Sequence, residues 1–191
     1  ALTAITGNLE TAITASSRVL AVQGQVVPAT NVDVRLWAEL ENGDRIEGES
    51  NIGHAPSPIV RLGCLPERPP ALPRALEAIA SADLILLGPG SLYTSLLPNL
   101  LVPELVSAIR RSRAPRLYIC NLMTQPGETD GLDVRGHLRA IEAQLASLGI
   151  DQRLFTAVLA QDDLEDSPLV EHYRSRGAQP VVCDADDLRS D

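Results

Sequence analysis

The sequence contains no lysine, so all 16 of its basic residues are arginine. Within these 191 residues, this excludes the lysine of a Walker A phosphate loop, a Schiff-base lysine and a lysine general base. The 25 acidic residues give a formal net charge of −9. Because nucleic-acid phosphates require a basic face, the composition predicts no nucleic-acid partner.

Cysteines and long apolar runs are also scarce. The three cysteines, Cys64, Cys120 and Cys183, are far apart and form no CxxC motif. This pattern is typical of reduced thiols in a cytoplasmic protein, not of a disulfide framework or a zinc site. No apolar run approaches the roughly 18 residues that cross a bilayer, and no signal-like N-terminus is present, so we predict no membrane segment. The chain begins with Ala1 instead of Met, and we expect upstream residues to be missing.

The length of the chain predicts a single domain, residues 1–191. Its first half predicts a helix and a hairpin. Residues 8–21 have apolar side chains at helical spacing, with Asn8 as a candidate N-cap. Residues 32–48 alternate apolar and polar side chains around Asn42-Gly43, which predicts a β-hairpin with a type I′ turn. Its polar face indicates a sheet edge or a side subdomain.

The second half predicts alternating helices and strands after a proline-rich connector, residues 55–73, which itself contains the apolar stretch "IVRLGCL". Helices are expected at 73–82, 103–112, 133–148 and 168–176, and strands at 84–87, 116–120, 154–160 and 180–183. Alternation of this kind with continuous apolar strands predicts an α/β fold in which helices cover a parallel sheet over residues 74–191.

Two polar loops follow neighbouring predicted strands. "GPGSLYTS" follows 84–87, and "NLMTQPGETDG" follows 116–120. Ligands of parallel sheets bind beyond the carboxyl ends of the strands, where both loops should lie. Glycines allow close approach, and N–H groups and hydroxyls at a helix start form an uncharged cradle for phosphate. The predicted phosphate or nucleotide site is Gly88, Gly90, Ser91, Leu92, Tyr93, Thr94 and Ser95. The alternative is an ordinary strand-to-helix turn, in which Ser91 or Thr94 is only an N-cap.

The second loop has almost no apolar content, which is unusual for a packing segment. Its polar residues are candidates for base or sugar contacts: Asn121, Thr124, Gln125, Glu128 and Asp130. Glu128 and Asp130 could accept sugar hydroxyls, hold magnesium or cap the next helix. Asn8 is either a helix cap or a ligand contact, and Asn51 is either a turn residue or a ligand contact. No catalytic residue can be assigned, since no Ser-His-Asp or Cys-His spacing is present.

Two longer segments, "ADLILLGPGSLYTSLLPNLLVPEL" and "YICNLMTQPGETDG", resemble the signature segments of the YvcK/CofD-like family. The similarity begins at "LTAITGNLETAI" and covers nearly the whole chain. The resemblance implies a Rossmann-like three-layer sandwich with a mainly parallel sheet and an added β-hairpin. It further implies a cytoplasmic protein that binds a nucleotide-linked small molecule, such as a UDP-sugar. One branch of the family supports morphogenesis and the supply of cell-wall precursors during gluconeogenic growth.

The other branch of the family is a transferase. It moves a phospholactyl group from a guanosine diphosphate carrier to a deazaflavin with the help of Mg²⁺. The Ser91-Leu92-Tyr93 sequence resembles the first branch, so we expect a binding regulator without turnover, and Mg²⁺ only under the transferase alternative. Family members begin with a strand and a Gly-Gly-Gly-Thr-Gly loop that has no match here, so we expect an N-terminally incomplete domain with altered nucleotide affinity. The sequence is also compatible with a homo-oligomer.

Overall fold

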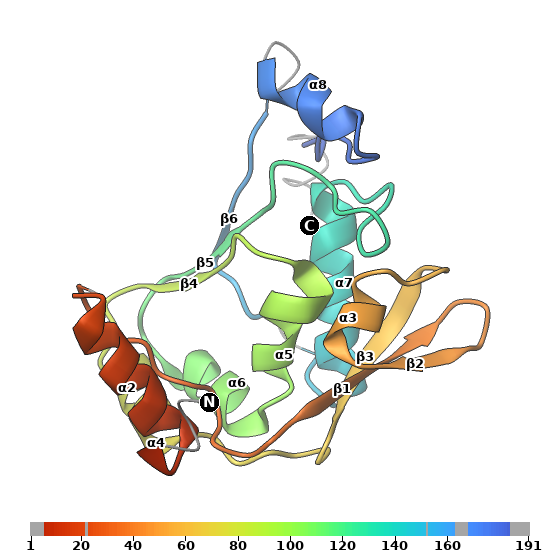
Figure 1. Ribbon diagram of the computed structural model, residues 1–191. Coiled ribbons are helices and arrows are strands. Elements are labelled where there is room, and N and C mark those ends of the chain that lie inside the picture. The colour runs from red at the N-terminus through yellow and green to blue at the C-terminus, as the bar shows by residue number, and fades with distance from the viewer. Residues whose placement is uncertain (1–5, 22, 152, 163–167, 184–191) are drawn as a thin grey trace.

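The computed structural model describes residues 6–21, 23–151, 153–162 and 168–183. It contains two three-stranded sheets with helices between them and at their sides (Figure 1). In the first sheet, β1 (Arg35–Leu40) lies between β2 (Arg45–Glu47) and β3 (Ile59–Leu65), and both pairings are antiparallel. The predicted hairpin is therefore confirmed, and the strand in the proline-rich connector extends its sheet.

The second sheet is parallel and has the order β4 (Ile85–Leu87), β5 (Arg116–Ile119), β6 (Ala157–Leu159). In its register, Leu86 lies opposite Leu117 and Tyr118 lies opposite Val158. The prediction that 84–87 and 116–120 are neighbouring parallel strands is confirmed. Their two following loops therefore leave the same edge of one sheet.

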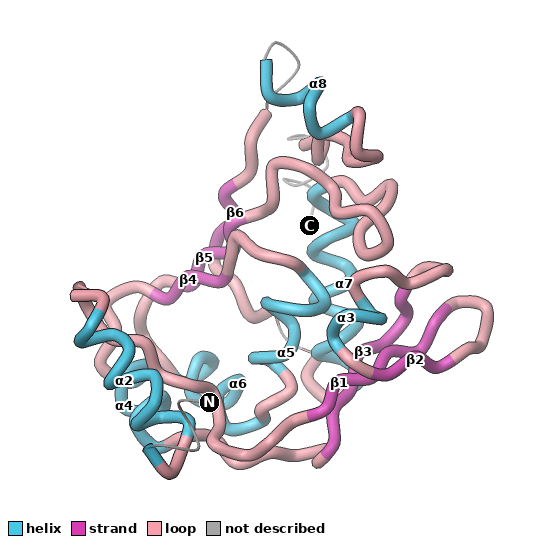
Figure 2. The backbone as a smooth tube through the Cα atoms, in the orientation of Figure 1, coloured by secondary structure: helices cyan, strands magenta, loops and turns pink. Residues whose placement is uncertain are grey.

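The longer helices follow the predicted positions, and three short helices, α3, η1 and α5, lie outside the predicted ranges. Their bounds are α2 (Leu9–Val19), α3 (Glu49–Ile52), α4 (Pro73–Ala80), the π-helix η1 (Leu92–Leu96), α5 (Leu97–Leu100), α6 (Pro103–Arg111), α7 (Val134–Ser147) and α8 (Pro168–Arg174). Figure 2 shows α5 and α7 between the two sheets, while α2 lies beside α4 at the lower left, next to α6.

A single main core joins these layers. Ala38 of β1 and Leu62 of β3 contribute to it from the antiparallel sheet, and Tyr118 contributes from the parallel sheet. Between them lie Leu97 of α5 and Ile141 of α7, with exposed fractions of 0% and 1%. The helix layer is thus buried from both sides, which fixes the positions of the strand-end loops.

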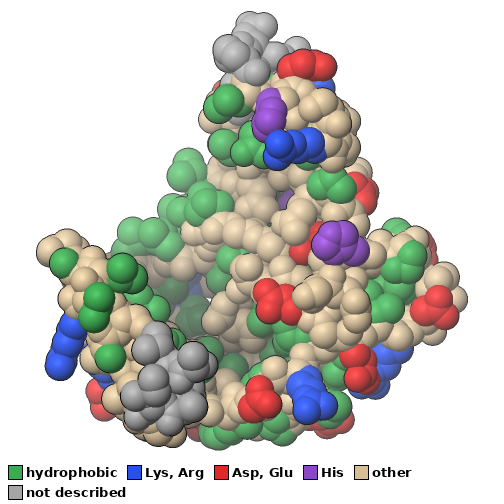
Figure 3. Space-filling view, viewed as in Figure 1, with side chains coloured by type: hydrophobic (Ala, Val, Ile, Leu, Met, Phe, Trp, Pro, Cys, Tyr) green, Lys and Arg blue, Asp and Glu red, His purple; other side chains and the backbone are tan. Residues whose placement is uncertain are grey.

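The outer face of the parallel sheet remains partly open among the described residues. Leu86 and Leu159 are 50% and 55% exposed, and Figure 3 shows apolar side chains gathered over this region. The continuous apolar strands predicted that helices cover the sheet. Helices α5 and α7 cover its inner face, and the outer face is the partly exposed one. No single described helix is long and apolar enough to cross a bilayer. The bent pair Leu92–Leu100 and Pro103–Arg111 meets that test together, with much of its surface in the core.

Two local predictions were wrong. The hairpin loop has no type I′ turn, because strand pairing ends at Glu39–Arg45 and only Gly43 has a positive φ, +87°. Asn42 instead accepts a hydrogen bond from the Asp44 N–H at 3.0 Å, which closes a longer turn. Residues 180–183 are not a strand of the parallel sheet. Pro180 lacks an N–H and makes one isolated antiparallel bridge, to Met123 beside the second loop.

The outer face of the antiparallel sheet carries the only tryptophan in the sequence, Trp37. Its ring lies flat over Gly63, where an added Cβ would come within 2.1 Å of the ring. The Arg45 and Arg61 guanidinium groups cover the ring, with their carbons 4.1 and 5.0 Å from its centre. The glycine therefore makes room for a cation–π stack that reduces Trp37 to 8% exposure.

We expect Gly63→Ala to displace this ring and to lower the free energy of unfolding by about 1–3 kcal/mol through overpacking. Urea denaturation measures the loss, and the emission of Trp37 should shift to longer wavelength because the ring becomes exposed. In a Trp37→Leu background, the same substitution should cost much less, since the collision is gone. Equal costs in both backgrounds would contradict this explanation.

Candidate functional site

The two predicted loops are joined by the side chain of Asn121. Its Oδ1 accepts a hydrogen bond from the Gly90 N–H at 3.1 Å, and its Nδ2 donates to the Gly90 carbonyl at 2.9 Å. The side-chain amide therefore pairs with both backbone groups of Gly90. This places the start of the first loop against the end of β5.

Glu128 makes a second and larger junction between the loops. Its carboxylate is 6% exposed and accepts hydrogen bonds from the Ser91 hydroxyl, from the Thr94 hydroxyl at 3.1 Å and from the Tyr93 N–H at 3.2 Å. Gln125 adds its side-chain Nε2 at 2.8 Å. The buried charge is thus satisfied by neutral donors, and its described contacts include no arginine or histidine.

These donors are largely the ones that the sequence predicts for a ligand phosphate. In the structure they converge on one carboxylate at the start of η1. Ser91 is also the N-cap, because its Oγ accepts the Thr94 N–H at 3.2 Å. Ser91 is therefore the N-cap of η1, and its hydroxyl is also one of the donors that surround the Glu128 carboxylate.

The two glycines of the first loop have different roles. Gly88 has φ +96°, and a Cβ there would lie 2.4 Å from the Ile119 carbonyl oxygen of β5. Only glycine allows the loop and strand to approach so closely. Gly90 is not in the positive-φ region, and a Cβ there would meet the Leu96 side chain at 3.2 Å. Gly88 is therefore the position in this loop at which a side chain would be most strained.

A pocket of about 210 Å³ lies beside this junction. Its walls are the 55–59 segment, the Tyr93 side chain and the second loop, from which Glu128 and Asp130 contribute carboxylates. The complete lining is Ala55, Pro56, Ser57, Pro58, Ile59, Tyr93, Gly127, Glu128, Asp130 and Leu132. The 55–59 wall was not predicted from the sequence, because proline-rich connectors carry no ligand signature and long-range packing brings this one here.

Tyr93 is held firmly in the wall of this pocket. Its hydroxyl donates to the Ile59 carbonyl at 3.2 Å, and the residue is 6% exposed. Burial, and secondarily the charge of Glu128, raises the pKa of Tyr93 to about 12. The phenol therefore remains a neutral hydrogen-bond donor at physiological pH.

The other predicted contacts are engaged within the fold. Thr124 exchanges two hydrogen bonds with Gln179, at 2.7 and 2.9 Å, and Asp130 accepts the Gly127 N–H at 2.7 Å. Leu92 is buried in the core and Ser95 is exposed. These residues surround the junction, and ligand contact by any of them stays a prediction.

Asn8 and Asn51 lie outside the pocket lining. Asn8 caps α2 by accepting the Thr11 N–H at 2.8 Å. Asn51 lies in α3 and donates to the Glu47 carbonyl at 2.7 Å. The cap role is therefore observed for Asn8, whereas Asn51 belongs to a short helix instead of a turn. Among the described residues, no group of three or more His, Cys, Asp or Glu side chains is arranged to hold a metal ion.

His137 lies one turn into α7, behind the second loop. It is fully buried, its Nδ1 is 2.8 Å from the Asp133 carbonyl, and its Nε2 has no hydrogen-bond partner among the described residues. Burial lowers the pKa of His137, although the contact with Asp133 opposes this effect. The imidazole is therefore neutral in the folded protein near neutral pH.

This shift makes stability depend on pH. A lowered folded-state pKa contributes stability above the unfolded value, about 6.5, and that contribution is lost as the pH falls below it. We expect the free energy of unfolding to fall between pH 7.5 and pH 5.0, and to fall less in His137→Gln, which has no imidazole to protonate. Urea denaturation at the two pH values checks this, and an equal fall in both proteins would contradict it.

Comparison with known proteins places this geometry in a family. The profile of 2-phospho-L-lactate transferase CofD matches residues 1–191. The chain belongs to the CofD family. A putative gluconeogenesis factor from Nostoc sp. is 54% identical over 184 residues, covering 96% of this chain and 40% of the relative. The gluconeogenesis factor of Bacillus subtilis is 40% identical over 190 residues, covering 100% of this chain and 58% of the relative.

A solved structure supports the same assignment. A UPF0052 family protein from Bacillus halodurans superposes with a TM-score of 0.88 at 41% identity, covering 99% of this chain and 59% of that one. This likeness confirms the predicted Rossmann-like α/β fold. The curated relatives confirm the resemblance to the gluconeogenesis-factor branch of the family. The chain spans about half the length of these relatives.

Proposed function

We propose that this chain is the part of a gluconeogenesis factor that binds a nucleotide-linked sugar at the carboxyl edge of its parallel sheet. It acts as a cytoplasmic regulator of cell shape and cell-wall precursor supply, without turnover of its own. The names of the curated relatives support a role in gluconeogenesis. The nucleotide-sugar ligand rests on the family resemblance of the two loops.

The observation that carries the proposal is the convergence of donors from Ser91, Tyr93 and Thr94 on one buried anion, the Glu128 carboxylate. Donors arranged around a carboxylate without a cation suit a phosphate oxygen equally well. The pocket beside them is lined by no arginine, lysine or histidine. A ligand phosphate in this region therefore has these neutral donors as its principal partners.

Binding in this account is an exchange of anions. Glu128 holds the donors in the free protein, and the ligand phosphate takes them as the carboxylate turns toward the sugar or ribose hydroxyls. Hydroxyls donate well to a carboxylate, so the displaced Glu128 gains new partners. Asp130, on the same wall of the pocket, provides a second acceptor for the sugar.

The second candidate is a phospholactyl transferase, which the description of the matching family favours. It would transfer the group from a guanosine diphosphate carrier to a deazaflavin with Mg²⁺. The carboxylates that would hold the ion, Glu128 and Asp130, are both engaged in hydrogen bonds.

One experiment separates the two candidates. The full-length protein is titrated calorimetrically with UDP-glucose and with GDP, and is incubated with the guanosine-linked phospholactate, deazaflavin and Mg²⁺. We expect heat from UDP-glucose and no release of GMP. Catalytic release of GMP would overturn the binding-only role, and absence of heat with every nucleotide would overturn the proposed ligand class.

A further inference from the structure

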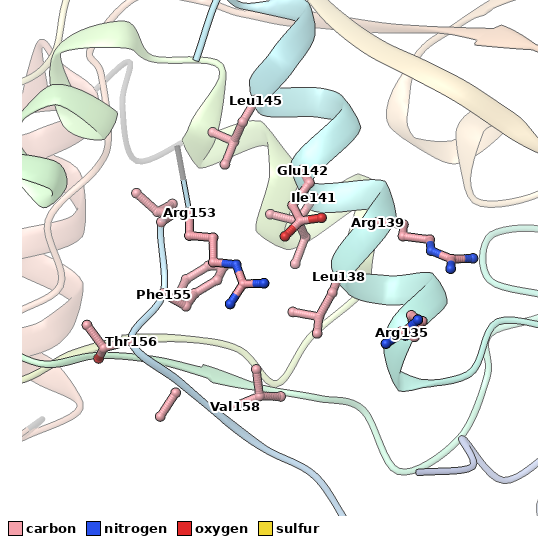
Figure 4. Close-up of a pocket in the computed structure, with 12 residues that line it drawn as sticks. Arg135, Leu138, Arg139, Ile141, Glu142, Leu145, Arg153, Phe155, Thr156 and Val158 are labelled. Carbon is pink, nitrogen blue, oxygen red and sulfur yellow. The ribbon is translucent and has the colours of Figure 1, made fainter. Parts of the chain in front are cut away.

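A second hollow lies between α7 and the segment that leads into β6 (Figure 4). Its volume is about 370 Å³, which falls within the range of small-molecule sites. None of its lining residues belongs to the loops 88–95 and 121–131. Its apolar lining is formed by Leu138, Ile141, Leu145, Leu154, Phe155, Ala157 and Val158.

Three arginines and one acid also line the hollow: Arg135, Arg139, Arg153 and Glu142. This is a local excess of positive charge in a chain whose formal net charge is −9. Arg153 is exposed and makes no ion pair or side-chain hydrogen bond with the described residues. In Figure 4, Arg153 and Phe155 project from one segment toward Leu138 and Ile141 of α7. The Arg153 guanidinium group therefore lies beside the apolar lining of the hollow.

We propose that this hollow binds a small organic carboxylate with an aromatic or aliphatic body. The apolar body lies against Leu138, Ile141 and Phe155, where its removal from water stabilises the complex. The carboxylate pairs with Arg153, because the two donors of a guanidinium match the two oxygens of a carboxylate. Glu142 repels ligands of higher charge, so the site selects a monoanion over a polyphosphate. This site is independent of the nucleotide site proposed above.

The test uses 4-phenylbutyrate, 4-phenylbutanol and inorganic phosphate as probes of the ¹⁵N-labelled full-length protein. Phenylbutyrate should shift amide resonances of α7 and residues 153–158 in a saturable manner. Phenylbutanol, which keeps the apolar body without the charge, should bind at least about tenfold more weakly. Phosphate, which has no apolar body, should cause no saturable shift in this region.

Arg153→Gln removes the proposed partner of the carboxylate and should weaken phenylbutyrate binding about tenfold or more. Arg68→Gln is the matched control, because Arg68 is also exposed and lies outside the hollow. The control should bind as the parent does. Equal binding of phenylbutyrate and phenylbutanol, unchanged affinity in Arg153→Gln, or shifts confined to other parts of the protein would each overturn the proposal.

Discussion

Replacement of Gly88 with alanine should lower the free energy of unfolding by about 3–5 kcal/mol and abolish UDP-glucose binding. Two effects combine at this position. A φ of +96° is strained for any residue with a Cβ, and that Cβ would lie 2.4 Å from the Ile119 carbonyl oxygen. Because the oxygen belongs to the backbone of β5, no side-chain rotation relieves the collision. The loop must move away from the strand end, and the junction with Asn121 opens.

Gly131→Ala is the control for this prediction. Gly131 has φ +71°, and a Cβ there would meet nothing within 4 Å. It therefore carries the conformational strain without the collision, and we expect a loss of about 1–2 kcal/mol. Urea denaturation of both variants isolates the contribution of the close approach. Equal losses would mean that the loop does not depend on its contact with β5.

Glu128→Ala should have two opposite effects. It removes the acceptor of the buried Tyr93 N–H and of the Ser91 and Thr94 hydroxyls, and we expect a loss of about 2–4 kcal/mol in the free energy of unfolding. It also removes the anion that competes for these donors. The affinity for UDP-glucose should therefore rise about tenfold, as calorimetry can measure.

The matched control is Glu77→Ala, which removes the same charge from an exposed position on α4. It should leave both stability and affinity close to those of the parent. If Glu128→Ala binds UDP-glucose more weakly than the parent, the carboxylate is a fixed support or a ligand contact, and the exchange of anions is wrong. The proposed ligand class would survive that result.

The sequence was sufficient for the elements with strong local patterns. Asn8 acts as the N-cap of α2, as expected, and the two apolar runs at 84–87 and 116–120 pair in parallel. Because the carboxyl ends of parallel strands share one edge of the sheet, the two loops were correctly predicted to lie together. These features depend on side-chain periodicity and on capping chemistry, which are written in a few consecutive residues.

The contacts within the site could not be obtained in the same way. The Glu128 carboxylate meets Ser91 across 37 positions of sequence, and Tyr93 reaches Ile59 across 34. Neither pairing has a local signature, because each is set by how the sheets and helices pack. At Asn42-Gly43, the register in which Glu39 lies opposite Arg45 leaves a loop longer than two residues, and Gly43 takes its positive-φ position.

The measurement that tests the central claim most directly is amide chemical-shift mapping of the ¹⁵N-labelled full-length protein with UDP-glucose. The claim is that the two loops at the carboxyl edge of the parallel sheet bind the nucleotide-linked sugar. We predict saturable shifts at Gly90, Ser91, Tyr93, Thr94 and Glu128, with little change in residues 135–158. Saturable shifts that leave these loop residues unchanged, or no saturable shift at all, would contradict the account.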